Sequence, residues 1–192
     1  MRIISGKLKG RIIKLPRGIR ATSDKVRKAL FDILGERVVN SEVLDLFAGS
    51  GSLGIEAVSR GAESVIFVEK DTKCVEKIKE NLSITGLACL PDGSQACRTG
   101  RGYRVIQLDV FEAIKKLSRE TEKFDIIFLD PPYYKGMAKN SLQTLLQYDI
   151  LKPNGLVVAE HYKKDELHHT LGELALVRQE RYGDTILSFY RR

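Results

Sequence analysis

Two short motifs contain the residues best suited to bind a cofactor or to act on a substrate. The first spans residues 45–54 and holds three glycines spaced as Gly49-x-Gly51-x-x-Gly54. Glycines allow a tight turn and let a ligand approach the backbone at the N-terminus of a helix. Glu69 follows Gly49 by 20 residues, where a carboxylate can accept hydrogen bonds from ribose hydroxyls. This pattern predicts a cofactor that contains a nucleoside, and by itself it fits NAD and S-adenosylmethionine equally well.

The second motif is the tetrapeptide Asp130-Pro131-Pro132-Tyr133. A proline nitrogen carries no hydrogen, so the two prolines stiffen the chain and leave backbone carbonyls available as acceptors. The Asp130 carboxylate and a proline carbonyl would form a pair of fixed acceptors, which suits an NH₂ donor, and Tyr133 offers a flat face for a base. The alternative is a turn that ends a strand and packs a tyrosine. Guanine N2 and adenine N6 both present two N–H groups, so the motif alone does not choose between them.

A regular alternation of strands and helices would bring both motifs to one edge of a sheet. Short apolar strands are expected at residues 43–47, 64–69, 103–108, 124–129 and 155–160, and helices at 53–60, 72–84, 110–117 and 137–148. Continuous apolar strands between helices predict a parallel sheet covered on both faces. Ligands of such sheets bind at the carboxyl ends of the strands. Residues 176–182 and 185–190, separated by Gly183-Asp184, predict a terminal antiparallel hairpin.

Positive charge is concentrated at the N-terminal end of the chain. Residues 1–31 hold ten Lys or Arg against the single acid Asp24, a charge of +9, whereas the whole chain carries +7. This asymmetry predicts a polyanionic partner, with a merely solubilising surface as the alternative. Residues 2–15 are expected to form a β-hairpin, and a helix follows to about Gly35. We therefore divide the chain into a basic extension, residues 1–35, and a main domain, residues 36–192.

Composition limits the remaining possibilities. A chain of 192 residues is about one domain, and 43% hydrophobic with 30% charged residues excludes collagen, coiled coil and wholesale disorder. The sequence shows no secretory signal and no apolar run of the ~18 residues that a membrane helix needs. Three cysteines do not make a disulfide framework, so a cytoplasmic protein with reduced thiols and no metal is expected. Residues 89–102 lack a pattern and predict an exposed loop.

With these residues in view, the sequence resembles a known family. The two motifs resemble those of class I methyltransferases that act on exocyclic amines of bases. Residues 20–31, which begin Arg20-Ala21-Thr22-Ser23, resemble the RsmD-type methyltransferases of guanine N2 in small-subunit ribosomal RNA. Residues 53–62 and 181–185 resemble the same family, whose usual pattern has Pro in place of Ala21 and Glu in place of Lys28. The resemblance covers nearly the whole chain apart from residues 89–102.

The resemblance implies a doubly wound, mostly parallel, seven-stranded Rossmann-like α/β sheet with a terminal antiparallel hairpin. It implies S-adenosylmethionine as the cofactor, bound by Asp45, Gly49, Gly51, Glu69, Asp109 and Val110. Glu69 would hold the ribose, Asp109 and Val110 would face the adenine, and Asp45 would lie under the methionine end. Two alternatives stay open: Asp109 could simply cap a helix, and Asp45 could be a buried structural acid satisfied by the amides of the glycine loop.

The resemblance also implies the reaction and the partner. Asp130, Pro131, Pro132 and Tyr133 would be the catalytic residues for methyl transfer to a guanine N2 in 16S ribosomal RNA. The expected substrate is ribosomal RNA in an assembling small subunit, methylated in the cytoplasm by a monomer that needs neither metal nor membrane. The residues expected to contact RNA are Lys7, Lys9, Arg11, Lys14, Arg20 and Arg27.

Three other functions compete with this one. A DNA or RNA adenine-N6 methyltransferase would use the same tetrapeptide. An NAD-linked oxidoreductase would use the glycine loop and Glu69, but it would leave residues 130–133 idle. A non-catalytic RNA-binding module would use residues 1–31 and would not need residues 130–133.

Overall fold

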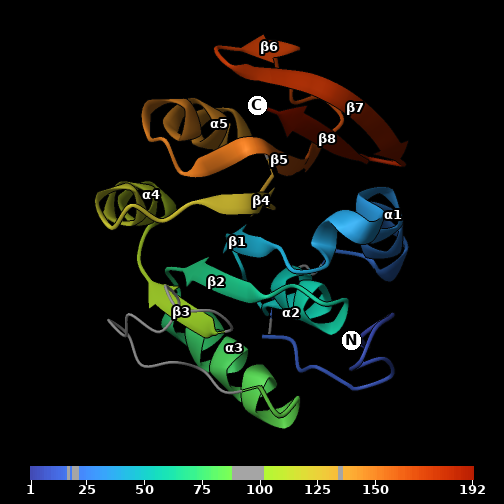
Figure 1. Ribbon diagram of the computed structural model, residues 1–192. Coiled ribbons are helices and arrows are strands. Elements are labelled where there is room, and N and C mark those ends of the chain that lie inside the picture. The colour runs from blue at the N-terminus through green and yellow to red at the C-terminus, as the bar shows by residue number, and fades with distance from the viewer. Residues whose placement is uncertain (17, 19–21, 88–101, 134–135) are drawn as a thin grey trace.

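The computed structural model describes residues 1–16, 18, 22–87, 102–133 and 136–192 and contains one eight-stranded sheet (Figure 1). The order of the strands is β3-β2-β1-β4-β5-β8-β7-β6. Their bounds are β1 Glu42–Leu46, β2 Ser64–Glu69, β3 Tyr103–Gln107, β4 Phe124–Leu129, β5 Leu151–Tyr162, β6 Thr170–Leu171, β7 Leu174–Tyr182 and β8 Thr185–Arg191. The helices are α1 Asp24–Leu34, η1 Gly35–Val38, α2 Ser52–Ser59, α3 Thr72–Ile84, α4 Val110–Arg119 and α5 Met137–Gln147.

The sheet confirms the expected doubly wound fold. Strands β3, β2, β1, β4 and β5 run parallel, and β8, β7 and β6 add antiparallel pairs at one edge. The chain order reverses at β1, which lies between β2 and β4, and the carboxyl ends of strands at such a point are where ligands bind. The sheet has eight strands instead of the expected seven. The extra strand is β6, whose two residues are too few to produce a hydrophobic pattern.

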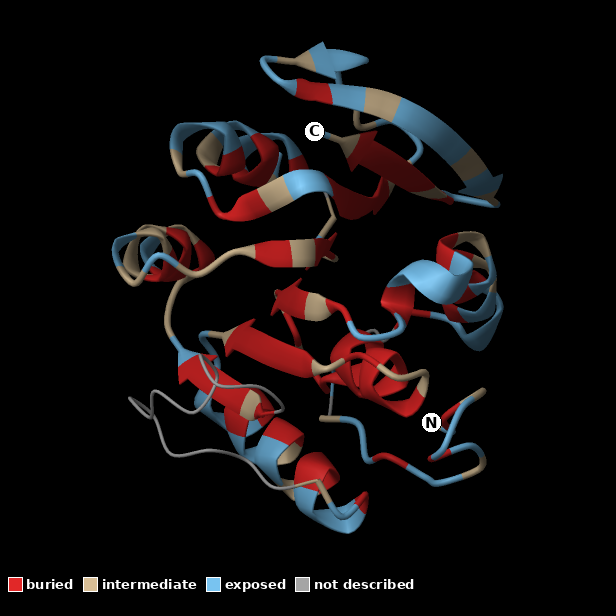
Figure 2. Cartoon of the chain, in the orientation of Figure 1, coloured by how far each residue is buried: buried red, intermediate tan, exposed pale blue. Residues whose placement is uncertain are grey.

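Helices cover both faces of the sheet (Figure 1). Apolar residues of α1, α2 and α3 pack in one cluster with Val43 and Phe128, and those of α4 and α5 pack in a second cluster with Leu44 and Leu46. Neighbouring residues of β1 therefore point to opposite faces, as a strand requires. In Figure 2 the inner strands are buried, whereas the outward sides of α3 and α5 and much of β7 are exposed. The inner strands are therefore continuously apolar because helices bury both faces of the sheet.

The expected N-terminal hairpin forms only in part. Within residues 1–16, Arg2 with Ile12 is the one bridge between the two arms. The turn between the arms bonds to α2 instead: the Lys7 and Leu8 amides donate to the backbone oxygen and the Oγ of Ser59. Gly6 (φ +80°) approaches so closely that a Cβ there would lie 1.8 Å from the Ser59 oxygen. Backbone donors committed to a helix cannot also extend a strand ladder.

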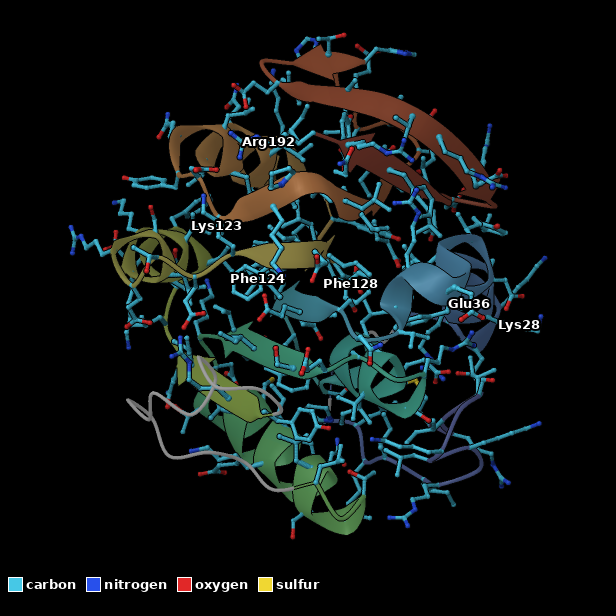
Figure 3. The ribbon with its side chains drawn as sticks, viewed as in Figure 1. Lys28, Glu36, Lys123, Phe124, Phe128 and Arg192 are labelled. Carbon is cyan, nitrogen blue, oxygen red and sulfur yellow. The ribbon has the colours of Figure 1, made fainter. Side chains whose placement is uncertain are left out.

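The N-terminal segment nevertheless shares the core of the main domain. Ile3, Leu8 and Ile13 are buried in the same cluster as α1, α2 and α3. The rings of Phe31 in α1 and Phe128 in β4 meet edge to face with centroids 5.7 Å apart, and Figure 3 shows Phe128 on the central sheet. The division of the chain at residue 35 stays a prediction. Apart from Gly102, the expected loop at residues 89–102 lies outside the described residues.

Candidate active site

One cavity of about 560 Å³ opens at the carboxyl ends of the parallel strands. It is lined by most of the residues that the sequence singled out: Gly49, Glu69, Asp109, Val110, Asp130, Pro131, Pro132 and Tyr133. Two expected cofactor residues, Asp45 and Gly51, do not line it. The lining also includes residues that the sequence did not assign to the site, among them Thr22 and Glu160. The two motifs, 76 positions apart from Gly54 to Asp130, therefore meet at one hollow.

The three glycines of the loop have three different tasks. Gly49 lies at the cavity with a φ of +56°, a conformation that favours glycine. Gly51 (φ +77°) begins α2 as its N-cap, and its amide donates to the Ala48 oxygen at 2.7 Å. Gly54 lets α2 pack on β2, because a Cβ there would lie 2.2 Å from the ring of Phe67. The glycines thus let α2 pack closely on β2, while the backbone of the loop at Gly49 lies at the cavity.

Glu69 ends β2 and is fixed by backbone amides. Its Oε2 accepts from the Gly49 amide at 2.9 Å, and its Oε1 accepts from the Lys70 and Asp71 amides at 2.8 and 2.9 Å. These bonds connect the end of β2 to the glycine loop that follows β1. The carboxylate is therefore held in one position at the wall of the cavity.

Asp45 matches the structural alternative that the sequence left open. It is 1% exposed, and its Oδ2 accepts from the Gly54 amide at 2.9 Å inside the protein. Burial raises the pKa of Asp45 to about 7, although the bond from Gly54 acts in the opposite direction. Asp45 therefore holds the first turn of α2 from behind the glycine loop.

Asp109 caps a helix and also lies at the cavity, so its role toward the cofactor stays a prediction. It is the N-cap of α4, and its Oδ1 accepts from the Phe111 amide at 3.0 Å. It also lines the cavity together with Val110. A residue at the junction of β3 and α4 can do both, because the N-terminus of the helix itself points toward the ligand edge of the sheet.

The Asp-Pro-Pro-Tyr motif follows β4 and is held by side chains from three other segments. Thr22, 5% exposed, donates its hydroxyl to Oδ2 of Asp130 at 2.6 Å. The Tyr133 hydroxyl lies 3.1 Å from Oε1 of Glu160 and 2.8 Å from Oγ1 of Thr185. The Tyr133 ring also lies 5.8 Å from the ring of Tyr162. The carboxylate and the aromatic ring are therefore both oriented by residues that are distant in the sequence.

Sequence reasoning missed Thr22, Glu160 and Thr185 as site residues. Thr22 belongs to the segment that carries the family resemblance, but its residue type and position do not indicate a bond to Asp130. Glu160 ends the strand predicted at residues 155–160. This position at the carboxyl edge of the sheet could have identified it as a site residue. Thr185 had no such signal, because it reaches Tyr133 through the pairing of β8 with β5.

The basic N-terminal residues that are expected to contact RNA differ in their exposure and in their bonds to other residues. Lys7 and Lys9 are exposed. The Arg11 guanidinium donates to the Thr85 oxygen at 2.7 Å, and the Lys14 ammonium lies 2.5 Å from a Glu80 carboxylate oxygen, with both side chains at the surface. Arg20 lies outside the described residues.

Arg27 is a correction to the expected RNA contacts. It is 1% exposed, and its guanidinium donates to the Arg2 oxygen at 2.7 Å and to the Asp24 carboxylate at 2.9 Å. Burial lowers the pKa of Arg27, and the nearby Asp24 and Glu56 carboxylates partly offset this. Arg27 therefore joins the N-terminal segment to α1 and cannot reach a phosphate. On the same helix, Lys28 points outward in Figure 3 and pairs with Asp32 at 2.6 Å.

The fold and the site together define the class of protein. A mostly parallel sheet that reverses at β1, a glycine loop before α2, an acid at the end of β2 and Asp-Pro-Pro-Tyr after β4 define a Rossmann-like class I methyltransferase. The sequence model of the family described as "Conserved hypothetical protein 95" matches residues 1–191. The chain belongs to this family, the RsmD family of methyltransferases.

Individual relatives agree with this assignment. The chain is 37% identical to ribosomal RNA small subunit methyltransferase D of Haemophilus influenzae, over 87% of this chain and 81% of the relative. It is 30% identical to the protein of the same name from Escherichia coli K12, over 100% and 90%. The solved structure of a hypothetical protein from Thermus thermophilus is 32% identical over 98% of each chain, with a TM-score of 0.81. The expected family, fold and enzyme class are confirmed.

Two further kinds of feature are absent from the described residues. No helix there combines the length and the apolarity that crossing a membrane requires. In the same part of the chain, His, Cys, Asp and Glu side chains form no group of three or more that could hold a metal ion.

Proposed function

We propose that the protein transfers a methyl group from S-adenosylmethionine to the exocyclic N2 amine of a guanine in 16S ribosomal RNA. The observation that carries this proposal is that Gly49, Glu69 and the Asp130–Tyr133 motif line a single cavity. The names of the Haemophilus and Escherichia relatives support ribosomal RNA of the small subunit as the substrate. We further propose that the enzyme acts in the cytoplasm as a monomer, on RNA in an assembling subunit.

The residues around the cavity fit S-adenosylmethionine. A volume of about 560 Å³ lies in the range of roughly 300–1,000 Å³ typical of small-molecule sites. Glu69, fixed by backbone amides, would accept the ribose hydroxyls, and Asp109 with Val110 would face the adenine. The backbone at Gly49 would lie against the methionine part. When bound, the cofactor supplies a methyl group on a positively charged sulfur.

Asp130 and the Pro131 carbonyl would prepare the amine. The guanine N2 lone pair is delocalised into the ring, which makes the amine a poor nucleophile. Accepting its two N–H groups favours a pyramidal nitrogen and exposes the lone pair, and fixed acceptors stabilise the positive charge that develops on nitrogen. The bond from Thr22 to Oδ2 orients the Asp130 carboxylate at the wall of the cavity. Asp130 or water then takes the proton that the methylated amine loses.

Tyr133 would hold the base in place. Its hydroxyl is bonded to Glu160 and Thr185, so the plane of its ring is set by β5 and β8. Stacking of a base on an aromatic side chain contributes about 1–3 kcal/mol. Holding the base and the methyl donor in one orientation converts a bimolecular encounter into an effectively unimolecular step.

The basic N-terminal segment would bind RNA phosphates. Neutralising Lys7 and Lys9 together should weaken RNA binding and reduce its salt slope by about 0.7–0.9 for each phosphate that is no longer neutralised. Lys115 and Lys139 on α4 and α5 provide the control, because their double neutralisation removes the same charge from the opposite face of the sheet. RNA affinity measured over a range of salt concentrations tests this. An equal response of the two double variants would show that the N-terminal charges only aid solubility.

Product mapping tests the proposed reaction. Protein-free 16S ribosomal RNA and small-subunit particles, each lacking the modification, are incubated with the enzyme and labelled S-adenosylmethionine, and the products are located by mass spectrometry. N2-methylguanine at a single position is the expected product, with the particle arm faster than the free RNA arm. N6-methyladenine would overturn the guanine assignment. In parallel, S-adenosylmethionine should raise the melting temperature, and stabilisation by NAD alone would overturn the cofactor assignment.

A further inference from the structure

Glu160 is a carboxylate at the cavity to which the proposed reaction gives no role. It lines the cavity, is only 6% exposed and lies on β5. In the pairing of β4 with β5, Leu129 is opposite Ala159, so the next residues, Asp130 and Glu160, follow side by side. Neighbouring strands are about 4.8 Å apart, and residues at the same register point to the same face. The two carboxylates therefore form a short row of acceptors at the edge of the sheet.

The position of Glu160 is fixed by a chain of hydroxyl groups. The Tyr133 hydroxyl donates to Oε1 of Glu160 at 3.1 Å, and Tyr133 itself can then accept from Thr185 at 2.8 Å. An ionised carboxylate can accept about four hydrogen bonds, so the bond from Tyr133 uses only part of its capacity. A carboxylate held in this way at the wall of a cavity can accept a hydrogen bond from a donor on the ligand.

The edge of guanine carries such a donor next to the amine that is methylated. Guanine presents N1–H beside its N2 amine, so three N–H bonds point from one edge. Adenine presents a lone pair on N1 beside its N6 amine, and that lone pair would face a carboxylate unfavourably. Enzymes that act on an extruded base read it by hydrogen bonds to this edge. A row of two carboxylates matches guanine and opposes adenine.

We propose that Glu160 accepts the N1–H of the target guanine and thereby selects guanine over adenine. This inference rests on the proposed function, because it assigns specificity within the same cavity. Asp130 and Pro131 would take the N2 amine, Glu160 would take N1–H, and Tyr133 would cover the face of the ring. The tetrapeptide alone could accept the N2 amine of guanine or the N6 amine of adenine. Glu160 on the neighbouring strand β5 would therefore distinguish the two bases.

The test compares two bases at the target position in otherwise identical RNA. One RNA carries guanine, and the other carries 2-aminopurine, which keeps the amine but has a lone pair on N1. The native enzyme should have a kcat/KM for guanine about 10- to 100-fold higher, the range for one hydrogen bond to a charged group. In Glu160→Gln the ratio should fall to within a few-fold, because the amide can accept from Tyr133 and donate to N1 of 2-aminopurine.

Two controls separate base selection from a structural role. Glu180→Gln removes a carboxylate of β7 that lies outside the cavity, and it should keep the native ratio. Tyr133→Phe removes the bond to Glu160 but leaves the carboxylate in place. Tyr133→Phe should lower kcat/KM for the guanine RNA and for the 2-aminopurine RNA by a similar factor. If Glu160 served only to orient Tyr133, Glu160→Gln would behave like Tyr133→Phe and the ratio would not change.

The outcomes distinguish this inference from the proposed function. A native enzyme that methylates no guanine N2 contradicts the proposed function itself. A native enzyme that methylates guanine N2 without preferring guanine to 2-aminopurine overturns the role of Glu160, and this measurement needs no variant. A preference that persists unchanged in folded Glu160→Gln overturns it as well.

Discussion

The cavity has two sides that are built in different ways. The side that we propose for the cofactor, here the cofactor side, consists of the glycine loop, Glu69 and Asp109, and its main bonds use backbone amides. The side that we propose for the target base, here the base side, consists of Thr22, Asp130, Tyr133, Glu160 and Thr185, and its bonds join one side chain to another. Gly49 and Glu69 are 20 residues apart, whereas Thr22 and Asp130 are 108 apart.

The two sides therefore differ in how much of the fold each one needs. A glycine loop and an acid on the next strand lie within one strand–helix–strand unit, so local geometry assembles them. The base side needs the N-terminal segment, β4, β5 and β8 to be packed together first. Binding of the cofactor should therefore tolerate changes on the base side, and catalysis should not.

The largest effect is expected from Asp130→Ala. Loss of one preorganised group that acts in the transition state should lower kcat by about 10²–10³. The affinity for S-adenosylmethionine should change little, because Asp130 is on the base side. Single-turnover methylation and calorimetric cofactor binding measure the two quantities. Near-normal turnover would remove Asp130 from the mechanism.

The matching change on the cofactor side is Glu69→Ala. Loss of hydrogen bonds to a charged group should weaken cofactor binding by about 10- to 100-fold, while kcat at saturating cofactor stays close to the native value. Glu76→Ala, on the exposed side of α3, is the control. A fall in kcat as large as that of Asp130→Ala would show that the two sides do not act independently.

Asp45→Asn tests the buried acid behind the glycine loop through its pH dependence. The pKa of Asp45 is raised to about 7 in the folded protein, above its value of 3.8 in the unfolded chain. The folded state therefore binds the proton more tightly, and stability is lost as pH rises from about 4 through 7. Between pH 5 and 8 the native protein should lose about 1–3 kcal/mol more stability than Asp45→Asn.

Denaturant unfolding of both proteins at each pH measures this difference, and other titrating groups cancel in the comparison. Asparagine can still accept from the Gly54 amide, so cofactor affinity should be retained. Parallel pH profiles would contradict a protonated Asp45, and a large loss of cofactor affinity would restore it as a cofactor contact.

The smallest effect is expected from Thr22→Val. Without the hydroxyl, Asp130 loses one orienting bond, and kcat should fall by about 3- to 10-fold, the range for a single hydrogen bond. Thr22→Ser should restore the rate, and cofactor affinity should not change. Ser23→Ala is the matched control, because it removes the N-cap bond to Val26 and destabilises α1 without touching Asp130.

A double-variant cycle completes the test of Thr22. If Thr22 acts through Asp130, Thr22→Val should have no further effect once Asp130 is alanine. Independent losses that multiply in the double variant would assign Thr22 a separate role.

Features that depend on local rules could be predicted from the amino-acid sequence. The apolar strands, the helix of residues 72–84 and the turn at Gly183-Asp184 are set by hydrophobic periodicity and turn chemistry, and all occur in the structure. The same is true of the cofactor side. The glycines of this loop are required by local backbone geometry, because Gly49 and Gly51 have positive φ angles and Gly54 leaves no room for a Cβ beside Phe67.

Contacts between side chains of distant segments could not be predicted in this way, because they depend on how the elements pack. The charge of Arg27 predicted a phosphate contact, but packing of the N-terminal segment on α1 and α2 buries it. Glu160 became a neighbour of Asp130 through the register of β4 and β5, and Thr22 reached the same carboxylate through the path of the N-terminal segment. Contacts of this kind depend on how whole elements pack, and residue types and their spacing along the chain do not encode that directly.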